Sequence, residues 1–156
     1  MARSHGLEEN SKHQDGNKEE EESYYHALLT SHHLVSPNKR RALQSWAHEL
    51  ALRGFAKVGH PGVIYAEGAR GAVEAFVRRV KGMQWLALRV RFVEPVDVRE
   101  EGGRKEDEKL EAGEREKTRW VELEKVGEVV EEMRRMGRER YVLEMGIGSA
   151  GAGGTG

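Results

Sequence analysis

The sequence predicts an α+β fold whose core is a β-α-β-β-α-β segment. Two stretches of residues 24–98 place apolar side chains at the spacing of an amphipathic helix, and four shorter stretches have the composition or the alternation of strands. Their order along the chain is that of the ferredoxin-like arrangement, in which two helices cover one face of an antiparallel sheet. A shorter β-α-β pattern over residues 118–147 predicts an extension packed on this core.

The first half of the core begins with a strand. Residues 24–34 are rich in Tyr, Leu and Thr and lack a helical period. Ser36 and Pro37 suit the cap and the first turn of the helix that follows, and Gly54 is expected to end it. The inner stripe of this helix consists of Leu43, Trp46, Ala47 and Leu50.

The second half of the core begins with a hairpin, whose strands are predicted over residues 55–58 and 62–66. A second helix follows over residues 69–81, and its inner stripe consists of Val73, Phe76, Val77 and Val80. Residues 85–93 then alternate as a strand. One face of this strand carries Leu86, Leu88, Val90 and Phe92, and the other carries Trp85, Ala87, Arg89 and Arg91.

The extension is too small to fold alone, so it should pack on the core. Residues 119–123 are predicted as a strand, and residues 126–137 as a helix with one apolar stripe. Four apolar residues then alternate and predict a final strand, namely Tyr141, Leu143, Met145 and Ile147.

The remaining segments are too polar to contribute to a core. The chain has 156 residues, of which 34% are charged and 37% hydrophobic, and its net charge is -1. Residues 1–23 carry 3 basic and 7 acidic residues and are predicted to be a disordered acidic tail. Residues 99–117 carry 14 charges in 19 positions, which predicts a charged flexible linker. Residues 148–156 are predicted to be a flexible Gly-rich tail.

Composition excludes several classes of function. The chain has no cysteine, which excludes disulfide scaffolds, thiolate zinc sites and a cysteine nucleophile. It has neither an 18-residue apolar run nor a signal peptide, so an intracellular protein away from the membrane is expected. Because it lacks the motifs of nucleotide-binding loops and of serine hydrolases, we expect no enzyme activity, no cofactor and no small-molecule substrate.

Positive charge is concentrated in the middle of the chain. Residues 24–98 carry 11 basic and 5 acidic residues, between acidic flanks. Such a core attracts polyanions. The alternative is that these cations form an ordinary solvated surface.

Three cations stand in the first turn of the first helix, Lys39, Arg40 and Arg41. Cations there oppose the helix dipole, at a cost of roughly some tenths of a kcal/mol each. A bound phosphate would explain them, because free backbone N–H groups and three cations would converge on it. The alternative is that the long side chains splay into solvent.

The outer face of the strand 85–93 is a second candidate interface. Trp85, Arg89 and Arg91 would stack on unpaired bases and neutralise the phosphates between them. The alternative is that the extension covers this face, which would make Trp85 a core residue and the arginines its rim.

His32 and His33 are candidates for contact with phosphate near the start of the first helix. Adjacent residues of a strand point to opposite faces, so the pair should not chelate one metal ion, and a third ligand such as His26 or His60 has no recognised spacing. No metal site is therefore predicted. His48 is expected to be partly buried, and Glu67 is expected to help cap the second helix.

Several segments together resemble the C-terminal domain of pre-mRNA-processing factor 3, which also ends the RWD domain-containing proteins. They are Thr30-Ser31-His32-His33-Leu34, Asn38-Lys39-Arg40-Arg41, Trp46-Ala47-His48-Glu49-Leu50, Gly54-Phe55, the run from Pro61 to Gly68, Trp85 before a basic strand, and Tyr141 to Gly148. The resemblance covers about residues 24–98 and implies a ferredoxin-like domain without known catalysis.

In the splicing factor this domain binds paired small nuclear RNAs. The resemblance therefore implies a non-catalytic RNA-binding module linked to pre-mRNA splicing, with structured small nuclear RNA as its partner and the nucleus as its location. The alternative, from the RWD-linked members, is a protein–protein interaction module that does not bind RNA.

Overall fold

The computed structural model describes residues 23–96 and 119–146. Apart from Ser23, the predicted acidic tail, the charged linker of residues 99–117 and the Gly-rich tail lie outside these residues. Within the two described ranges, no helix is both long and apolar enough to cross a membrane.

The described chain forms an α+β fold, which confirms the predicted class. Its elements are β1 (Tyr24–Ser31), α2 (Pro37–Glu49), β2 (Arg53–Lys57), β3 (Gly62–Ala69), α3 (Arg70–Lys81), β4 (Arg89–Pro95), β5 (Trp120–Leu123), α6 (Val126–Arg135) and the 3₁₀ helix η1 (Glu139–Met145). They build one five-stranded sheet in the order β4-β1-β3-β2-β5. The first four strands pair antiparallel, in the strand order of the ferredoxin-like arrangement. The sheet as a whole is mixed, because β5 pairs parallel to β2.

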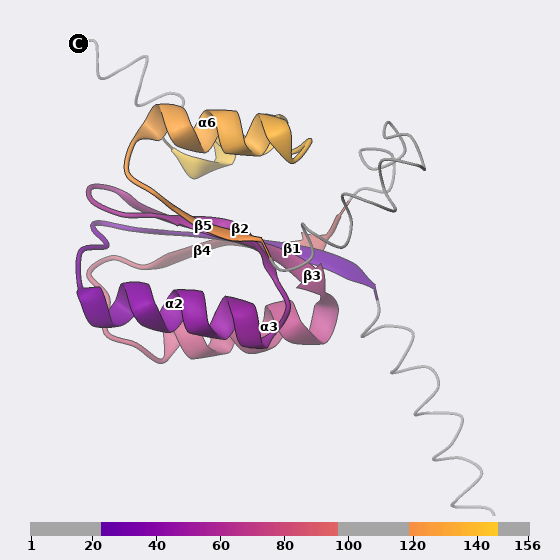
Figure 1. Ribbon diagram of the computed structural model, residues 1–156, viewed down its shortest axis with the longest axis horizontal. Helices are drawn as coiled ribbons and strands as arrows, with labels where there is room; N and C mark the ends of the chain where they lie inside the picture. Colours follow the sequence, from indigo (N-terminus) through magenta and orange to yellow (C-terminus); the bar gives the residue numbers. More distant parts are fainter. Residues whose placement is uncertain (1–22, 97–118, 147–156) are drawn as a thin grey trace, which may run out of the picture.

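The sheet lies between two helical layers (Figure 1). Helices α2 and α3 cover one face, and their apolar stripes form a core with residues of β1 and β3 such as Leu29 and Ile64. Helix α6 and η1 cover the opposite face, where Met133 and Met145 pack on Leu28. Each face of the sheet therefore has its own hydrophobic core.

Helix α2 begins where the sequence predicts. The Ser36 side chain accepts a hydrogen bond from Lys39 N, and Pro37 occupies the first turn. The predicted end is wrong, because the helix stops at Glu49 and Ala51 takes a positive φ of 55°. Gly54 instead lies inside β2, where its φ of 152° brings the backbone so near β3 that a Cβ would lie 1.9 Å from Tyr65 O. Glycine is required there by the close approach of two strands.

The strand predicted over residues 85–93 begins only at Arg89. Before it, Ala87 takes a positive φ of 58°, and the Trp85 indole donates a hydrogen bond to Val80 O at 2.7 Å. Trp85 therefore packs against the α2–α3 layer, and its predicted place on the opposite face is wrong.

The predicted alternation along this strand is also interrupted. The register of β4 against β1 shifts between Leu28, opposite Phe92, and Leu29, opposite Val90. Arg91 is therefore an extra residue of β4 with no partner residue in the register with β1. As a result the Phe92 side chain faces the α6 layer, not the face that the alternation predicts.

The predicted final strand is wrong, because residues 139–145 form η1. Gly137 and Gly146 take positive φ values of 76° and 73° on either side of it. Its buried residues are Tyr141, Val142 and Met145, which have a helical spacing, whereas Leu143 is 76% exposed.

Candidate functional site

One end of the sheet gathers aromatic and basic side chains from separate segments. We call it the histidine corner and define it by His32 and His33 after β1, Lys39 in α2, His60 between β2 and β3, and Trp85 before β4. The centroids of the His33 and His60 rings lie 5.2 Å apart, and that of His32 lies 5.6 Å from His33 and 5.7 Å from His60. Lys39 Nζ lies 4.7 Å from the centroid of the Trp85 ring, a cation–π contact.

Backbone hydrogen bonds hold the corner together. His32 N donates to Leu86 O at 3.0 Å, which ties the end of β1 to the segment before β4. Leu34 and Gly59 exchange two backbone hydrogen bonds of 2.9 and 2.8 Å, which bring the β2–β3 turn beside the start of α2. The turn itself is braced by Lys57 Nζ, which donates to Pro61 O at 2.9 Å. The side chains of the corner are therefore placed by regular elements and short connections.

Lys39 gives the corner a positive charge and lies near His33. Burial, together with the neighbouring His60, His32 and Lys39, holds the pKa of His33 below its usual value. His33 Nδ1 is buried and makes no hydrogen bond. An anion placed at the corner would attract Lys39 and would favour protonation of the imidazoles.

The structure brings His60 to the two histidines that the sequence singles out. The signal that locates it is the Gly59-His60-Pro61-Gly62 turn, which a hairpin must place beside the end of β1. Within residues 23–96 and 119–146, however, no three metal-ligating side chains are positioned to hold one metal ion. The arrangement is suited to contacts with an anion.

The three cations of the first turn of α2 do not converge. Lys39 reaches Trp85, whereas Arg40 forms an exposed ion pair with Glu122 of β5, at 3.1 Å from Nε. Arg41 donates to the neutral Asn38 Oδ1 at 2.7 Å. Successive helical residues are about 100° apart around the axis, so three of them point in three directions. Only Lys39 joins the corner.

The two arginines of β4 are placed differently. Arg89 is exposed and pairs in register with Thr30, close to the corner. Arg91 Nε donates to Thr30 Oγ1 at 2.9 Å. The face that was expected to offer an open base-stacking surface is covered by α6 and η1 (Figure 1).

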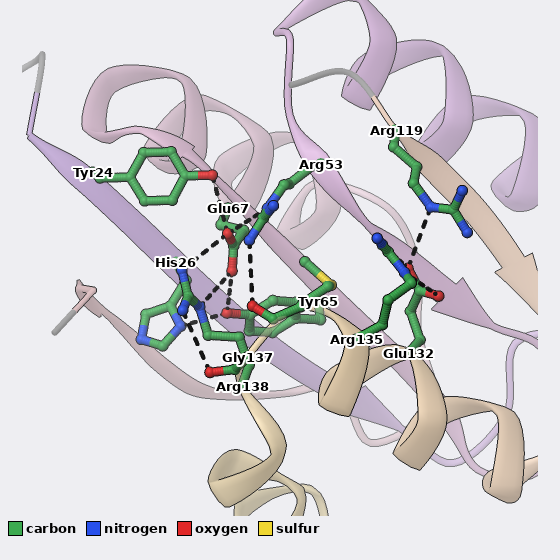
Figure 2. A network of polar contacts seen from close by, with 11 residues as sticks. Tyr24, His26, Arg53, Tyr65, Glu67, Arg119, Glu132, Arg135, Gly137 and Arg138 are labelled. Carbon is green, nitrogen blue, oxygen red and sulfur yellow. Dashed lines mark hydrogen bonds and ion pairs between the residues drawn. The ribbon is translucent and has the colours of Figure 1, made fainter. Parts of the chain in front are cut away.

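The sequence predicts that Glu67 helps to cap α3. This prediction is wrong, because the helix has no side-chain cap. Its carboxylate is fully buried at the centre of a polar network (Figure 2). Oε1 accepts hydrogen bonds from Arg53 Nε at 2.6 Å and from Tyr24 OH at 3.0 Å. Oε2 accepts from Tyr65 OH at 2.6 Å and from Arg138 Nε at 2.9 Å.

The charges of this network stabilise one another. Burial alone would raise the pKa of Glu67, but the guanidinium groups of Arg53 and Arg138 hold it below its usual value. Burial and the Glu67 charge raise the pKa of Tyr65 well above its usual value. Since the carboxylate and the phenol are fully buried, the network is a structural device rather than a place for substrate.

His26 extends the network on β1. Its Nδ1 lies 2.6 Å from Tyr65 OH, and Nε2 is buried and makes no hydrogen bond. Burial lowers the pKa of His26 to about 4. This histidine is therefore neutral at physiological pH and lies apart from the histidine corner.

His48 is exposed, which corrects the expectation of a partly buried side chain. It lines an open groove between α2 and β5, together with Arg41, Gln44, Ser45 and Trp120. Ala47 is a buried residue of the apolar stripe. His48 is the next residue along the helix, so its side chain lies outside that stripe.

Two comparisons with known proteins relate to this geometry. The family model described as "Small nuclear ribonucleoprotein Prp3, C-terminal domain" matches residues 27–135, which span most of the described chain. Among solved structures, the dark-state structure of BlrB, a BLUF protein, is similar over 80% of this chain and 94% of that chain, with 14% sequence identity and a TM-score of 0.49.

Proposed function

This chain belongs to the family of the small nuclear ribonucleoprotein Prp3 C-terminal domain, and from that premise we propose that it is a non-catalytic RNA-binding module of a splicing-type ribonucleoprotein in the nucleus. The family is a splicing-factor domain family that is not known as catalytic. The observation that carries the proposal is the histidine corner, where three imidazoles lie together near the N-terminus of α2 and Lys39 lies over the Trp85 ring.

The corner offers the contacts that an RNA backbone needs. Lys39 supplies a fixed positive charge, and the imidazoles of His32 and His60 add donors that become cationic on protonation. Phosphate contacts of this kind supply most of the affinity and little sequence preference. Arg89 would extend the positive surface along β4.

RNA is positioned here rather than cleaved. Imidazoles can themselves act as general acid and base, so the proposal of binding without cleavage rests on the family rather than on the residue types of the corner. General acid–base cleavage would need an acid and a base held at fixed distance from one ribose and its phosphate. Binding requires only that donors and cations face the same backbone.

The test is a titration of labelled single-stranded and duplex RNA at two salt concentrations, followed by a check that the RNA stays intact. The purified chain should bind at low salt, and affinity should fall steeply as salt rises. Lys39→Gln should weaken binding and reduce the slope of log Kd against log salt by about 0.7 to 1. The His32→Gln/His33→Gln double variant should weaken binding further.

Arg134→Gln is the matched control. It removes one cation from an exposed ion pair on α6, on the opposite face of the sheet, and should leave RNA affinity unchanged. If neither form of RNA binds at low salt, the proposal fails and a protein-interaction role gains support. If Arg134→Gln weakens binding as much as Lys39→Gln, the corner is not the site.

A further inference from the structure

A groove lies between α2 and β5, on the side of the sheet that α2 and α3 cover. It has a volume of about 560 Å³ and is lined by Arg41, Gln44, Ser45, His48 and Trp120. The four helical residues follow one another at i, i+3, i+4 and i+7, so they form one continuous stripe of α2. β5 lies at one edge of the sheet, so no further strand of the described chain borders the groove on this side.

The aromatic wall of the groove is rigid. Trp120 belongs to β5, whose backbone pairs with Gly54 of β2, and Gly54 N donates to Arg119 O at 2.9 Å. Its ring packs in a T-shaped contact on the buried Phe76, with centroids 5.6 Å apart. The indole is therefore held in one orientation while it still lines the groove.

The other walls are polar and carry positive charge. Gln44 and Ser45 are exposed and provide an amide and a hydroxyl, which can both donate and accept. Arg41 is hydrogen-bonded to the neutral Asn38, so this contact leaves its charge uncompensated. Among the lining residues that the structure describes, none is aliphatic, as the apolar anchor of a bound peptide would require.

We infer that this groove holds an unpaired nucleobase, stacked on Trp120 and hydrogen-bonded along its edge by Gln44 and Ser45. Single-stranded nucleic acid is bound in this way elsewhere, by aromatic platforms combined with basic grooves. Arg41 would contact the phosphate next to the stacked base. The inference rests on the proposed function and adds to it a preference for unpaired over paired RNA.

The groove is continuous with the first turn of α2. A smaller hollow of about 320 Å³ adjoins it and shares Arg41 and Gln44, and Pro37 lines its far end. Residues 37–48 rise about 16 Å along the helix axis. Arg40 and Glu122 also line the smaller hollow, whereas Lys39 is directed to Trp85, so the groove and the histidine corner are separate contact points on α2.

The experiment compares two probes of equal length, a single-stranded oligouridylate and the same ribose-phosphate backbone without bases. The variants are Gln44→Leu, which changes an exposed side chain, and Trp120→Leu, with circular dichroism as a check of folding. Each should weaken binding of the oligouridylate by about five- to ten-fold and leave binding of the abasic backbone unchanged. Arg134→Gln should change neither.

The outcomes separate this inference from the proposed function. If both groove variants bind both probes like the unmodified protein, while Lys39→Gln weakens both, RNA binding stands and the groove inference is overturned. If an acidic peptide binds the groove and the variants affect only that peptide, the inference is likewise overturned. If neither probe binds at low salt, the proposed function itself fails.

Discussion

Glu67 of β3 and Arg138 of the α6–η1 connection form a buried ion pair, with 2.9 Å between Glu67 Oε2 and Arg138 Nε. Glu67 is fully buried and Arg138 is 1% exposed, although 71 residues separate them in the sequence. The pair joins the extension to the central sheet within a buried polar network that also includes Arg53 and Tyr65 (Figure 2). The extension is therefore held by a directional contact as well as by packing.

Breaking this pair should destabilise the whole domain. Arg138→Met removes one guanidinium and leaves the carboxylate of Glu67 short of a partner in a buried site. The expected loss of unfolding free energy is about 3–5 kcal/mol, measured by urea denaturation. The matched control is Arg134→Met, which breaks an exposed pair with Glu139 and should cost about 0–1 kcal/mol. Equal losses in the two variants would show that the buried pair has no special role.

His26 should make stability depend on pH. Its pKa in the folded state is about 4, below the usual 6.5, so the unfolded chain binds the additional proton between these values. The contribution is therefore complete above pH 6.5 and is lost as the pH falls toward 4. The loss should reach about 3 kcal/mol.

The pH prediction is checked by urea denaturation across this range in the unmodified protein and in His26→Gln. The groups that face His26 include Tyr65, Glu67, Arg138 and Glu94, and both proteins retain them. The pKa of Glu67 is held below its usual value, so this carboxylate stays ionised through most of the range. A difference between the two proteins that does not change with pH would contradict the assignment.

How much the sequence predicts depends on how local each feature is. Helix α2 follows from Ser36, Pro37 and a single apolar stripe, all within a few turns. The pairing of Glu67 with Arg138 depends on contacts between distant segments, and its only local sign is a carboxylate in an otherwise apolar strand. His60 joins the corner for the same reason, because only the fold brings its turn beside the end of β1.

The segment after α6 shows a different limit. Tyr141, Leu143 and Met145 alternate as a strand would, but Tyr141, Val142 and Met145 also fit a helical turn. The two patterns cannot be separated over so few residues. The positive φ values of Gly137 and Gly146, and the α6 layer that buries Val142, favour the 3₁₀ helix.

The candidate site shows the same contrast between local and distant features. Lys39 is predicted as a site residue from its position in the sequence alone. The groove beside Trp120 follows only from the position of β5 in the sheet.

Leu143 of η1 provides a direct check of this correction, with the buried Met133 of α6 as the comparison. Met133 of α6 is fully buried, so Met133→Ala should lower the free energy of unfolding by about 2–4 kcal/mol. Leu143 would be inward-facing in a strand but is 76% exposed in η1, so Leu143→Ala should change stability by less than about 0.5 kcal/mol. Denaturation of both variants measures these values. A large loss of unfolding free energy in Leu143→Ala would contradict η1 and favour the strand that the sequence predicts.

Two glycines should respond in opposite directions to the same substitution. Gly54→Ala would place a Cβ 1.9 Å from Tyr65 O at a φ of 152°, so β2 and β3 must separate and stability should fall by about 3 kcal/mol or more. Gly127 lies in α6, and an added Cβ there meets nothing within 4 Å. Gly127→Ala should therefore stabilise the domain by about 0.5–1 kcal/mol. Thermal unfolding of the two variants gives both signs.

RNA affinity should rise as the pH falls. The pKa of His33 lies below its usual 6.5 in the free protein, because of burial and the neighbouring His60, His32 and Lys39. A bound phosphate favours the protonated imidazole and raises this pKa, so binding takes up a proton in the range between the two values. Each proton taken up strengthens binding by at most about ten-fold per pH unit.

Titrations at about pH 7.5 and about pH 5.5 should therefore show tighter binding at the lower pH. The phosphodiester groups of the RNA keep their charge throughout, so the change belongs to the protein. His33→Gln should reduce the difference, whereas Lys39→Gln should weaken binding at both pH values and keep the difference. Because the loss of the His26 contribution lowers stability in the same range, circular dichroism at each pH must show a folded domain. Affinity that does not change with pH in the folded protein would mean that the imidazoles of the histidine corner do not face the RNA.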